Sequence, residues 1–331
     1  MRYLSLFFVS LVLNVHLMKA QQAYSKEPLA HTYSIVAIDP ETGDMGVAVQ
    51  SHWFSVGPLV TWGEAGVGVV ATQSFVNPDL GPEGLKLMKS GLGPKEALQK
   101  LLDEDDGRAV RQVAFLNHEG KVAAHTGESC IQAAGHHLGD GYSVQANMML
   151  NEKVWPAMSE AFEGSAGQPL AERLVAALEA AEAAGGDIRG KQSAALLVVK
   201  AEPTGKIWQD KLVDLRIEDH QNPIQEMKRL LKVHRAYEHM NKGDLAVEHN
   251  DINGAMKEYN AASKLFPENE EMKYWTAVTL ANVGRLDEAL PMFREVFSKN
   301  SNWRVLTPRL VDVGLLTIEP QKVKEILELE D

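Results

Sequence analysis

One loop of the sequence contains more charged and amide side chains than a connection between two elements needs. Residues 185–193 read GGDIRGKQS and join an alanine-rich segment to an apolar one. The two glycines can end a helix, but a turn does not require Asp187, Arg189 and Gln192 as well. An arginine can hold a carboxylate through two hydrogen bonds, and Asp187 could orient it or an amine. The same residues fit equally well a turn in which Asp187 and Arg189 only pair with each other. Both interpretations, a functional site and a structural pair, stay open.

Two further polar groups have structural interpretations. Asp214, Arg216 and Glu218 share one face of a strand because strand side chains alternate, and a charge ladder across strands is the favoured interpretation. His136 and His137 lie in a glycine-flanked segment that we interpret as a loop. Adjacent side chains point in different directions, so we predict no metal site there.

Composition narrows the class of protein. The 331 residues include 33 Lys and Arg and 45 Asp and Glu, a net charge of −12, which argues against a nucleic acid or an anionic membrane as partner. The apolar fraction of 45% is that of a globular protein. Cys130 is the single cysteine, which excludes an intrachain disulfide and cages of several thiolates. No P-loop or dinucleotide fingerprint occurs, and we expect no cofactor.

The first twenty residues have the build of a secretory signal peptide. Arg2 precedes an apolar run, and small or polar residues begin at Ala20. We therefore expect an exported protein, periplasmic or extracellular, with residues 21–31 as a linker; a retained membrane anchor is the alternative. Cleavage after Ala20 would remove Arg2 and Lys19, leaving 31 basic against 45 acidic residues and a net charge of −14.

Strands and paired helices must position the loop at residues 185–193. We predict strands over 33–38, 45–50, 66–73, 111–116, 121–125, 142–147, 193–200 and 212–217, and helices over 82–89, 94–102, 152–162 and 170–184. Tight turns such as 39–44 make the sheets largely antiparallel. The first two strands are apolar at nearly every position, so their sheet should be covered on both faces. Helices that arrive in pairs indicate an α+β fold with segregated layers.

A helical repeat follows Pro223. Ala255 and Ala289 are 34 residues apart, and so are Tyr259 and Phe293. This period and its small residues match the tetratricopeptide pattern, so we predict an all-α tetratricopeptide-like domain over 231–331. Two units are fewer than a free-standing array needs, so they should pack on the preceding domain, on the C-terminal tail or on a protein partner. An irregular helical bundle is the alternative.

Several short motifs together resemble a family of bacterial and archaeal proteins, domain of unknown function 1028. The matching segments are 32–37 (TYSIVA), 39–43 (DPETG), 46–51 (GVAVQS), 65–68, 71–73, 126–127, 185–196 and 212–220. That family resembles N-terminal-nucleophile hydrolases. The resemblance implies a four-layer αββα sandwich over residues 32–230.

The same resemblance implies a set of site residues. Thr32 would be the nucleophile, with its own α-amine as base. Ser51 would lie near it, and backbone N–H groups around Gln73 and Ser74 would stabilise the oxyanion. Asp187 falls where proteasome-like enzymes keep an acid. Three further residues would orient the substrate; they are Arg189, Gln192 and Ser193.

This implied chemistry requires a second cut, between His31 and Thr32, because an acylated threonine has no built-in base. The proteasome-type lysine has no counterpart in residues 61–69, TWGEAGVGV. We therefore carry two hypotheses: an exported amidohydrolase acting on a small amide or peptide-like substrate, and a non-catalytic ligand- or partner-binding protein on the same fold. In either, the helical repeats would mediate protein–protein interaction, and we expect a homo-oligomer.

Overall fold

The computed structural model describes residues 29–330, so the predicted signal peptide and residues 21–28 of the predicted linker lie outside it. The chain divides into two compact units, and the boundary in the sequence falls between Arg229 and Leu230. Among the described residues, no helix is both long and apolar enough to span a membrane.

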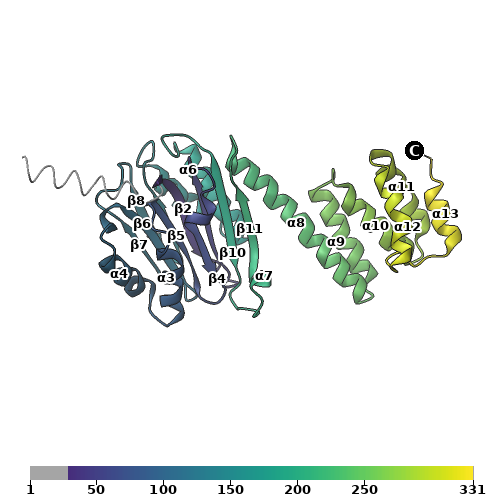
Figure 1. Ribbon diagram of the computed structural model, residues 1–331, viewed down its shortest axis with the longest axis horizontal. Coiled ribbons are helices and arrows are strands. Elements are labelled where there is room, and N and C mark those ends of the chain that lie inside the picture. Colours follow the sequence, from purple (N-terminus) through teal and green to yellow (C-terminus); the bar gives the residue numbers. More distant parts are fainter. Residues whose placement is uncertain (1–28, 331) are drawn as a thin grey trace, which may run out of the picture. The chain divides into compact units, whose positions relative to one another are not determined.

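The first unit contains two antiparallel sheets (Figure 1). Sheet A has the order β1-β5-β6-β7, with β4 also paired to β5. Its strands are β1 (Leu29–Ala30), β4 (Thr61–Glu64), β5 (Gly68–Phe75), β6 (Arg111–Asn117) and β7 (Val122–Thr126). Sheet B has the order β11-β10-β3-β2-β9-β8. Its strands are β2 (Thr32–Ile38), β3 (Met45–Ser51), β8 (Gly135–Gly139), β9 (Tyr142–Ala146), β10 (Ser193–Val199) and β11 (Lys211–Ile217).

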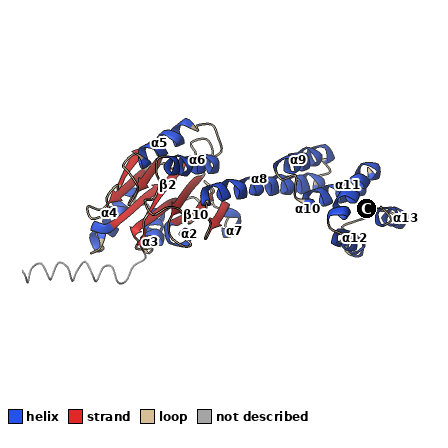
Figure 2. Cartoon of the chain, turned by 90° about the horizontal axis from the view of Figure 1, so that it is seen from above, coloured by secondary structure: helices blue, strands red, loops and turns tan. Residues whose placement is uncertain are grey.

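Helices cover the outer face of each sheet (Figure 2). The pair α3 (Leu80–Lys89) and α4 (Pro94–Glu104) packs on sheet A, and the pair α5 (Val154–Gly164) and α6 (Leu170–Ala183) packs on sheet B. Short helical turns complete the connections; they are α2 (Gly57–Val60), a 3-10 turn at Arg108–Val110 and α7 (Ile207–Asp210). The predicted α+β class with antiparallel sheets is confirmed.

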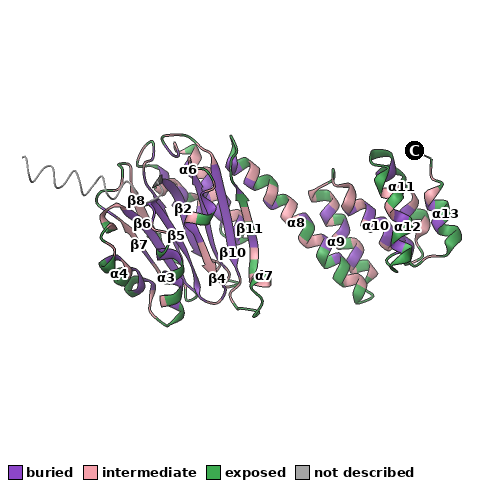
Figure 3. Cartoon of the chain, in the orientation of Figure 1, coloured by how far each residue is buried: buried purple, intermediate pink, exposed green. Residues whose placement is uncertain are grey.

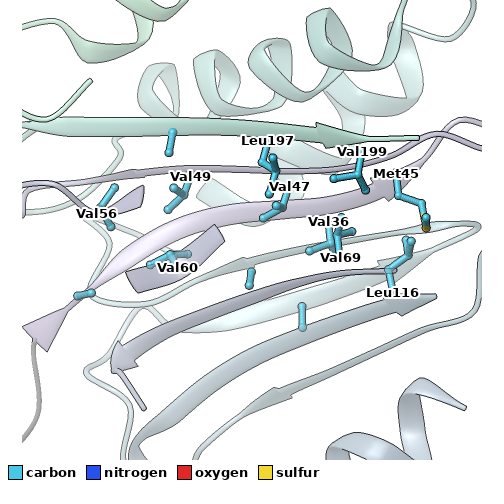
Figure 4. Close-up of a cluster of buried hydrophobic side chains, with 14 of the residues drawn as sticks. Val36, Met45, Val47, Val49, Val56, Val60, Val69, Leu116, Leu197 and Val199 are labelled. Carbon is cyan, nitrogen blue, oxygen red and sulfur yellow. The ribbon is translucent and has the colours of Figure 1, made fainter. Parts of the chain in front are cut away.

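The core between the sheets is built mainly from valine. Side chains of Val36, Val47 and Val49 on sheet B meet Val69 and Leu116 on sheet A, all fully buried (Figure 4). β-Branched residues suit this position because they pack well on a pleated surface. The central strands of both sheets are buried along their length, as Figure 3 shows for β2 and β5. The prediction of a sheet covered on both faces is therefore confirmed for the first hairpin.

Two local predictions differ from the structure. The segment around His136 and His137, predicted as a loop, is strand β8, which pairs with β9 at the edge of sheet B. The strand predicted over 66–73 is β5, and β4 precedes it unpredicted. Both missed strands are short and carry glycine, and they take their conformation from the partner strand rather than from their own composition.

Six helices make up the C-terminal part of the described chain, and no strand occurs there. They are α8 (Pro223–Glu248), α9 (Ile252–Leu265), α10 (Glu270–Asn282), α11 (Leu286–Lys299), α12 (Asn302–Asp312) and α13 (Pro320–Leu327). Both ends of α11 lie 34 residues after those of α9. Ala255 and Ala289 are fully buried, and so is Phe293 at the position equivalent to Tyr259. A Cβ atom on Gly243 would overlap the Tyr259 ring, so close helix packing requires glycine there.

Candidate active site

A row of hydrogen-bonding residues crosses one end of sheet B. In the strand register, Thr32 of β2 is opposite Ser51 of β3, and Ser51 is opposite Ser193 of β10. On the other side of β2, the backbone N–H of Asn147 donates to the Thr32 carbonyl at 3.1 Å. Thr32, Ser51, Ser193 and Asn147 are all fully buried. The antiparallel pairing thus brings together residues far apart in the chain.

The chain changes sheets at His31. Leu29 and Ala30 pair with Phe75 and Ser74 on the edge of β5, whereas Thr32 already belongs to sheet B. The His31–Thr32 peptide bond therefore crosses from one sheet to the other. This bond is the one whose cleavage would expose the Thr32 amine.

The His31 carbonyl oxygen accepts two hydrogen bonds from side chains. Ser51 Oγ donates at 2.6 Å and the Arg189 guanidinium donates at 2.8 Å. Donors aimed at a carbonyl oxygen withdraw electron density from its carbon and stabilise negative charge that develops on the oxygen. The pair of donors makes this carbonyl carbon more electrophilic than an ordinary peptide carbon.

Asp187 holds Arg189 in place. The Arg189 guanidinium donates to both carboxylate oxygens, at 3.0 and 2.7 Å, and the carboxylate also accepts from the His52 backbone N–H at 3.3 Å. Asp187 is only 4% exposed. The Asp187–Arg189 pair predicted from the loop is therefore present, and Arg189 also donates to the His31 carbonyl.

Thr32 itself is closed off in this form of the chain. The residue is 0% exposed, and its Oγ1 donates to the Ala30 carbonyl at 2.7 Å. Its nitrogen is part of the peptide bond to His31. Residues 29–31 must therefore leave before the hydroxyl can meet a substrate from solution.

Buried amides fill the space between the sheets next to Thr32. Gln73 Nε2 donates to the Thr32 carbonyl at 3.2 Å and to Gln112 Oε1 at 2.6 Å. Gln112 Oε1 also accepts from Asn147 Nδ2 at 2.9 Å. Sequence reasoning missed Gln112 and Asn147, although a glutamine within the apolar strand 111–116 was a signal that could have identified the first.

His31 was also missed, as a residue of a predicted linker. Its ring is 2% exposed, and Nδ1 lies 2.7 Å from Asn147 Oδ1. Burial lowers the pKa of His31, while the hydrogen bond to Asn147 opposes this effect. The imidazole is therefore neutral at neutral pH, and its ring is nearly perpendicular to that of Phe75, with 5.2 Å between the centroids.

The remaining predicted site residues take different positions. Gln192 Nε2 donates to Asp219 at 3.1 Å, and the Ser193 hydroxyl donates to the Trp53 carbonyl. Ser74 has a φ of 76° and lies opposite Ala30, with its hydroxyl 3.6 Å from Cys130 Sγ. The side chains that donate hydrogen bonds to the His31 carbonyl are those of Ser51 and Arg189.

The other candidate ligands and the single cysteine also have defined surroundings in the described chain. Residues 29–330 contain no group of three or more histidine, cysteine, aspartate or glutamate side chains that could hold a metal ion. His136 Nδ1 instead lies 2.8 Å from Thr126 Oγ1. Burial raises the pKa of the half-buried Cys130 thiol, which disfavours the nucleophilic thiolate.

The charged face predicted on the last strand is present, but its ion pairs lie within β11 and not across strands as predicted. Asp214 pairs with Lys211 at 2.6 Å and with Arg216 at 3.3 Å on β11. β11 is an edge strand, where charged side chains discourage pairing with another sheet. These residues therefore protect the edge of sheet B.

Comparison with known proteins places the first unit in a family. A family model described as a family of unknown function (DUF1028) matches residues 32–227. The crystal structure of protein SPO2555 from Silicibacter pomeroyi, which carries the same family model, is 34% identical, with a TM-score of 0.55 over 61% of this chain and 88% of that one. No curated protein matches the chain significantly.

Proposed function

The chain belongs to DUF1028, a family of unknown function, and we propose that it is an exported amidohydrolase of N-terminal-nucleophile type. Its substrate would be a small amide or peptide-like molecule. The observation that carries the proposal is the His31 carbonyl, which accepts hydrogen bonds from Ser51 and Arg189 immediately before Thr32.

The proposed maturation begins at that carbonyl. Thr32 Oγ adds to the His31 carbonyl carbon, with Ser51 and Arg189 stabilising the oxyanion. The C–N bond breaks as the hydroxyl proton passes to the Thr32 nitrogen, which leaves an ester between His31 and Thr32. Water then cleaves the ester, giving a His31 carboxylate and a Thr32 with free α-amine and hydroxyl.

Turnover would use the groups that maturation releases. An α-amine has a pKa of about 7.7–8.0 and can accept the Oγ proton near neutral pH. Oγ then attacks the substrate amide carbon, the amine half departs with a proton, and water hydrolyses the acyl ester. Ser51 and Arg189 would receive the substrate oxygen where they now hold the His31 carbonyl, and Asp187 would keep Arg189 oriented.

The fold supports this proposal. Two facing antiparallel sheets, each covered by a helix pair, are what an αββα sandwich requires, and Thr32 opens a central strand. For the C-terminal part we propose a tetratricopeptide-like module that binds a protein partner or a second copy, supported by the 34-residue offset of α9 and α11. Deletion of residues 236–331 should then change the oligomeric state or the captured partners.

The alternative is a binding protein that keeps its leader, the residues that precede Thr32. It is favoured by the complete burial of Thr32 in the uncut chain. In that case residues 29–31 would remain part of the fold, and Thr32 would be a structural residue at the start of β2.

The N-terminus of secreted protein separates the two. Wild type should begin at Thr32, and a hydroxyl-directed β-lactone probe should label Thr32 with a covalent mass shift. Thr32→Ala should keep the residues before position 32 and take no label, Thr32→Ser should be cut and labelled, and Thr42→Ala, in an exposed turn, should behave as wild type. A wild-type protein that begins at Gln21 and takes no label would overturn the hydrolase proposal.

A further inference from the structure

The three residues before Thr32 form the acyl side of the bond that the proposed reaction cuts. Leu29 and Ala30 add an antiparallel strand to the edge of β5, opposite Phe75 and Ser74. Adding a strand to a sheet edge is a general way to bind an extended peptide, because backbone hydrogen bonds supply affinity and side-chain pockets supply specificity. Residues 29–31 of the leader therefore serve as an example of how an extended peptide binds in this site.

The position of Ala30 accepts only a small side chain. Ala30 is fully buried and belongs to the valine-rich core between the sheets. Protein interiors are close-packed, so a larger side chain would have to displace core side chains around it. A peptide bound in place of the leader therefore needs alanine or glycine there.

The His31 side chain fills a pocket that has one polar wall. The imidazole is 2% exposed, and its Nδ1 lies 2.7 Å from Asn147 Oδ1. The Phe75 ring meets it edge to face, with the ring planes at 87°. The pocket thus combines an aromatic ring with a single amide group.

The surrounding hydrogen bonds determine which atom of that amide faces the pocket. Gln112 Nε2 donates to the backbone carbonyls of Gly135 and Ala146, at 3.2 and 2.9 Å, and a carbonyl can only accept. Gln112 Oε1 must then be the atom that accepts from Asn147 Nδ2. Asn147 consequently turns its oxygen toward His31, and the pocket offers an acceptor that requires an N–H donor.

We propose that the site selects extended peptides in which histidine, preceded by a small residue such as alanine, supplies the acyl side of the cleaved amide. The part of this inference that concerns the cleaved amide rests on the proposed function. The selecting contacts are Asn147 Oδ1, which accepts from the imidazole N–H, and Phe75, which bounds the ring. A phenylalanine has the flat shape but leaves the buried acceptor without a partner.

A cavity-rescue experiment tests the pocket in the uncut chain. The full-length His31→Gly, Thr32→Ala variant keeps the leader but lacks the ring. At about pH 8, where imidazole is mostly neutral, imidazole should bind saturably and raise the melting temperature. Thiazole has the same ring size and no N–H donor, and it should bind at least about tenfold more weakly, as expected for an unsatisfied buried acceptor.

Two matched variants separate this pocket from general imidazole binding. His118→Gly with Thr32→Ala removes an exposed turn histidine and should show no saturable binding. Adding Asn147→Leu to the His31→Gly, Thr32→Ala variant should abolish the preference for imidazole over thiazole. Equal binding of the two rings, or a preference that survives Asn147→Leu, would overturn the inference whatever Thr32 does.

A second measurement uses secreted protein that begins at Thr32. Leu-Ala-His anilide should be hydrolysed with a kcat/KM at least about tenfold above that of Leu-Ala-Phe anilide, and Asn147→Leu should remove the difference. Equal rates would refute the histidine preference while the hydrolase proposal stands. If the secreted chain stays uncut and hydrolyses neither, the hydrolase proposal fails, and the imidazole experiment still decides what the pocket selects.

Discussion

The Arg189 guanidinium donates a 2.8 Å hydrogen bond to the main-chain carbonyl of His31, the residue immediately before Thr32. The two residues are 158 positions apart in the chain. Arg189 is also held by both carboxylate oxygens of Asp187. A charged donor fixed in this way is already oriented before any negative charge develops on the oxygen, which is the condition for effective electrostatic stabilisation.

The first prediction concerns that donor. Arg189→Leu should slow the appearance of a Thr32 N-terminus by roughly 10²–10³-fold, the usual effect of losing one oxyanion donor. Arg189→Lys should recover little, because lysine lacks the planar fork that pairs with Asp187. Intact-mass measurements over time would give the rates. Arg229→Leu removes an exposed arginine that pairs with Glu226 and is the control; equal rates for the Arg189 and Arg229 variants would contradict the prediction.

The second prediction compares two serines of the same cross-strand row. Ser51→Ala should slow the cut before Thr32 by about tenfold or more, because it removes the 2.6 Å donor to the His31 carbonyl. Ser193→Ala should leave the rate unchanged, since that hydroxyl contacts the Trp53 carbonyl and the Val56 N–H instead. Both serines are fully buried, so equal slowing in the two variants would indicate a packing effect.

The third prediction concerns the amides between the sheets. Gln112→Leu should lower the free energy of unfolding by several kcal/mol, because Gln73 and Asn147 each lose a partner and an unsatisfied buried group costs roughly 1–3 kcal/mol. Urea titration of the Thr32→Ala background would measure it without interference from cleavage. Gln99→Leu, on the exposed side of α4, should change stability by less than about 0.5 kcal/mol.

The fourth prediction is a pH dependence at His31. Burial lowers its pKa below the ordinary value of 6.5, so the unfolded chain binds a proton at a pH where the folded chain does not. The stability contributed by the neutral ring is therefore present above about pH 6.5 and is lost as the pH falls toward the lowered pKa, by at most about 1.4 kcal/mol per pH unit.

Unfolding measured across that range would test this dependence in Thr32→Ala protein with and without His31→Gln. The stability difference between the two should shrink as the pH falls. A difference that is constant across the range at position 31 would show that the ring is not held neutral.

The fifth prediction concerns helix packing in the C-terminal unit. Gly243→Ala should destabilise that unit by about 1–3 kcal/mol, because the added Cβ would overlap the buried Tyr259 ring. Helix propensity alone would predict the opposite sign, since alanine favours a helix over glycine. Thermal unfolding would measure the change, with Asn260→Ala on the exposed face of α9 as control. A stabilised Gly243→Ala would show that the contact relaxes easily.

Local patterns in the sequence were sufficient for most of the elements. The first hairpin follows from two apolar runs around the turn at 39–44, and the end of α6 follows from Gly185 and Gly186, which both have positive φ. The positions of α9 and α11 follow from a repeat of period 34. These features depend on residues within one turn, one strand or one helix, so periodicity and turn chemistry reveal them.

The tertiary structure alone decided which of the candidate residues meet. The sequence by itself pointed to Thr32, Ser51, Asp187 and Arg189, two of them through a family resemblance only, and did not indicate that His31 presents its carbonyl to Ser51 and Arg189 or that Asn147 faces its ring. Strand register across a sheet and the crossing from one sheet to the other set these contacts. Register depends on pairing between segments far apart in the chain, and no local pattern encodes it.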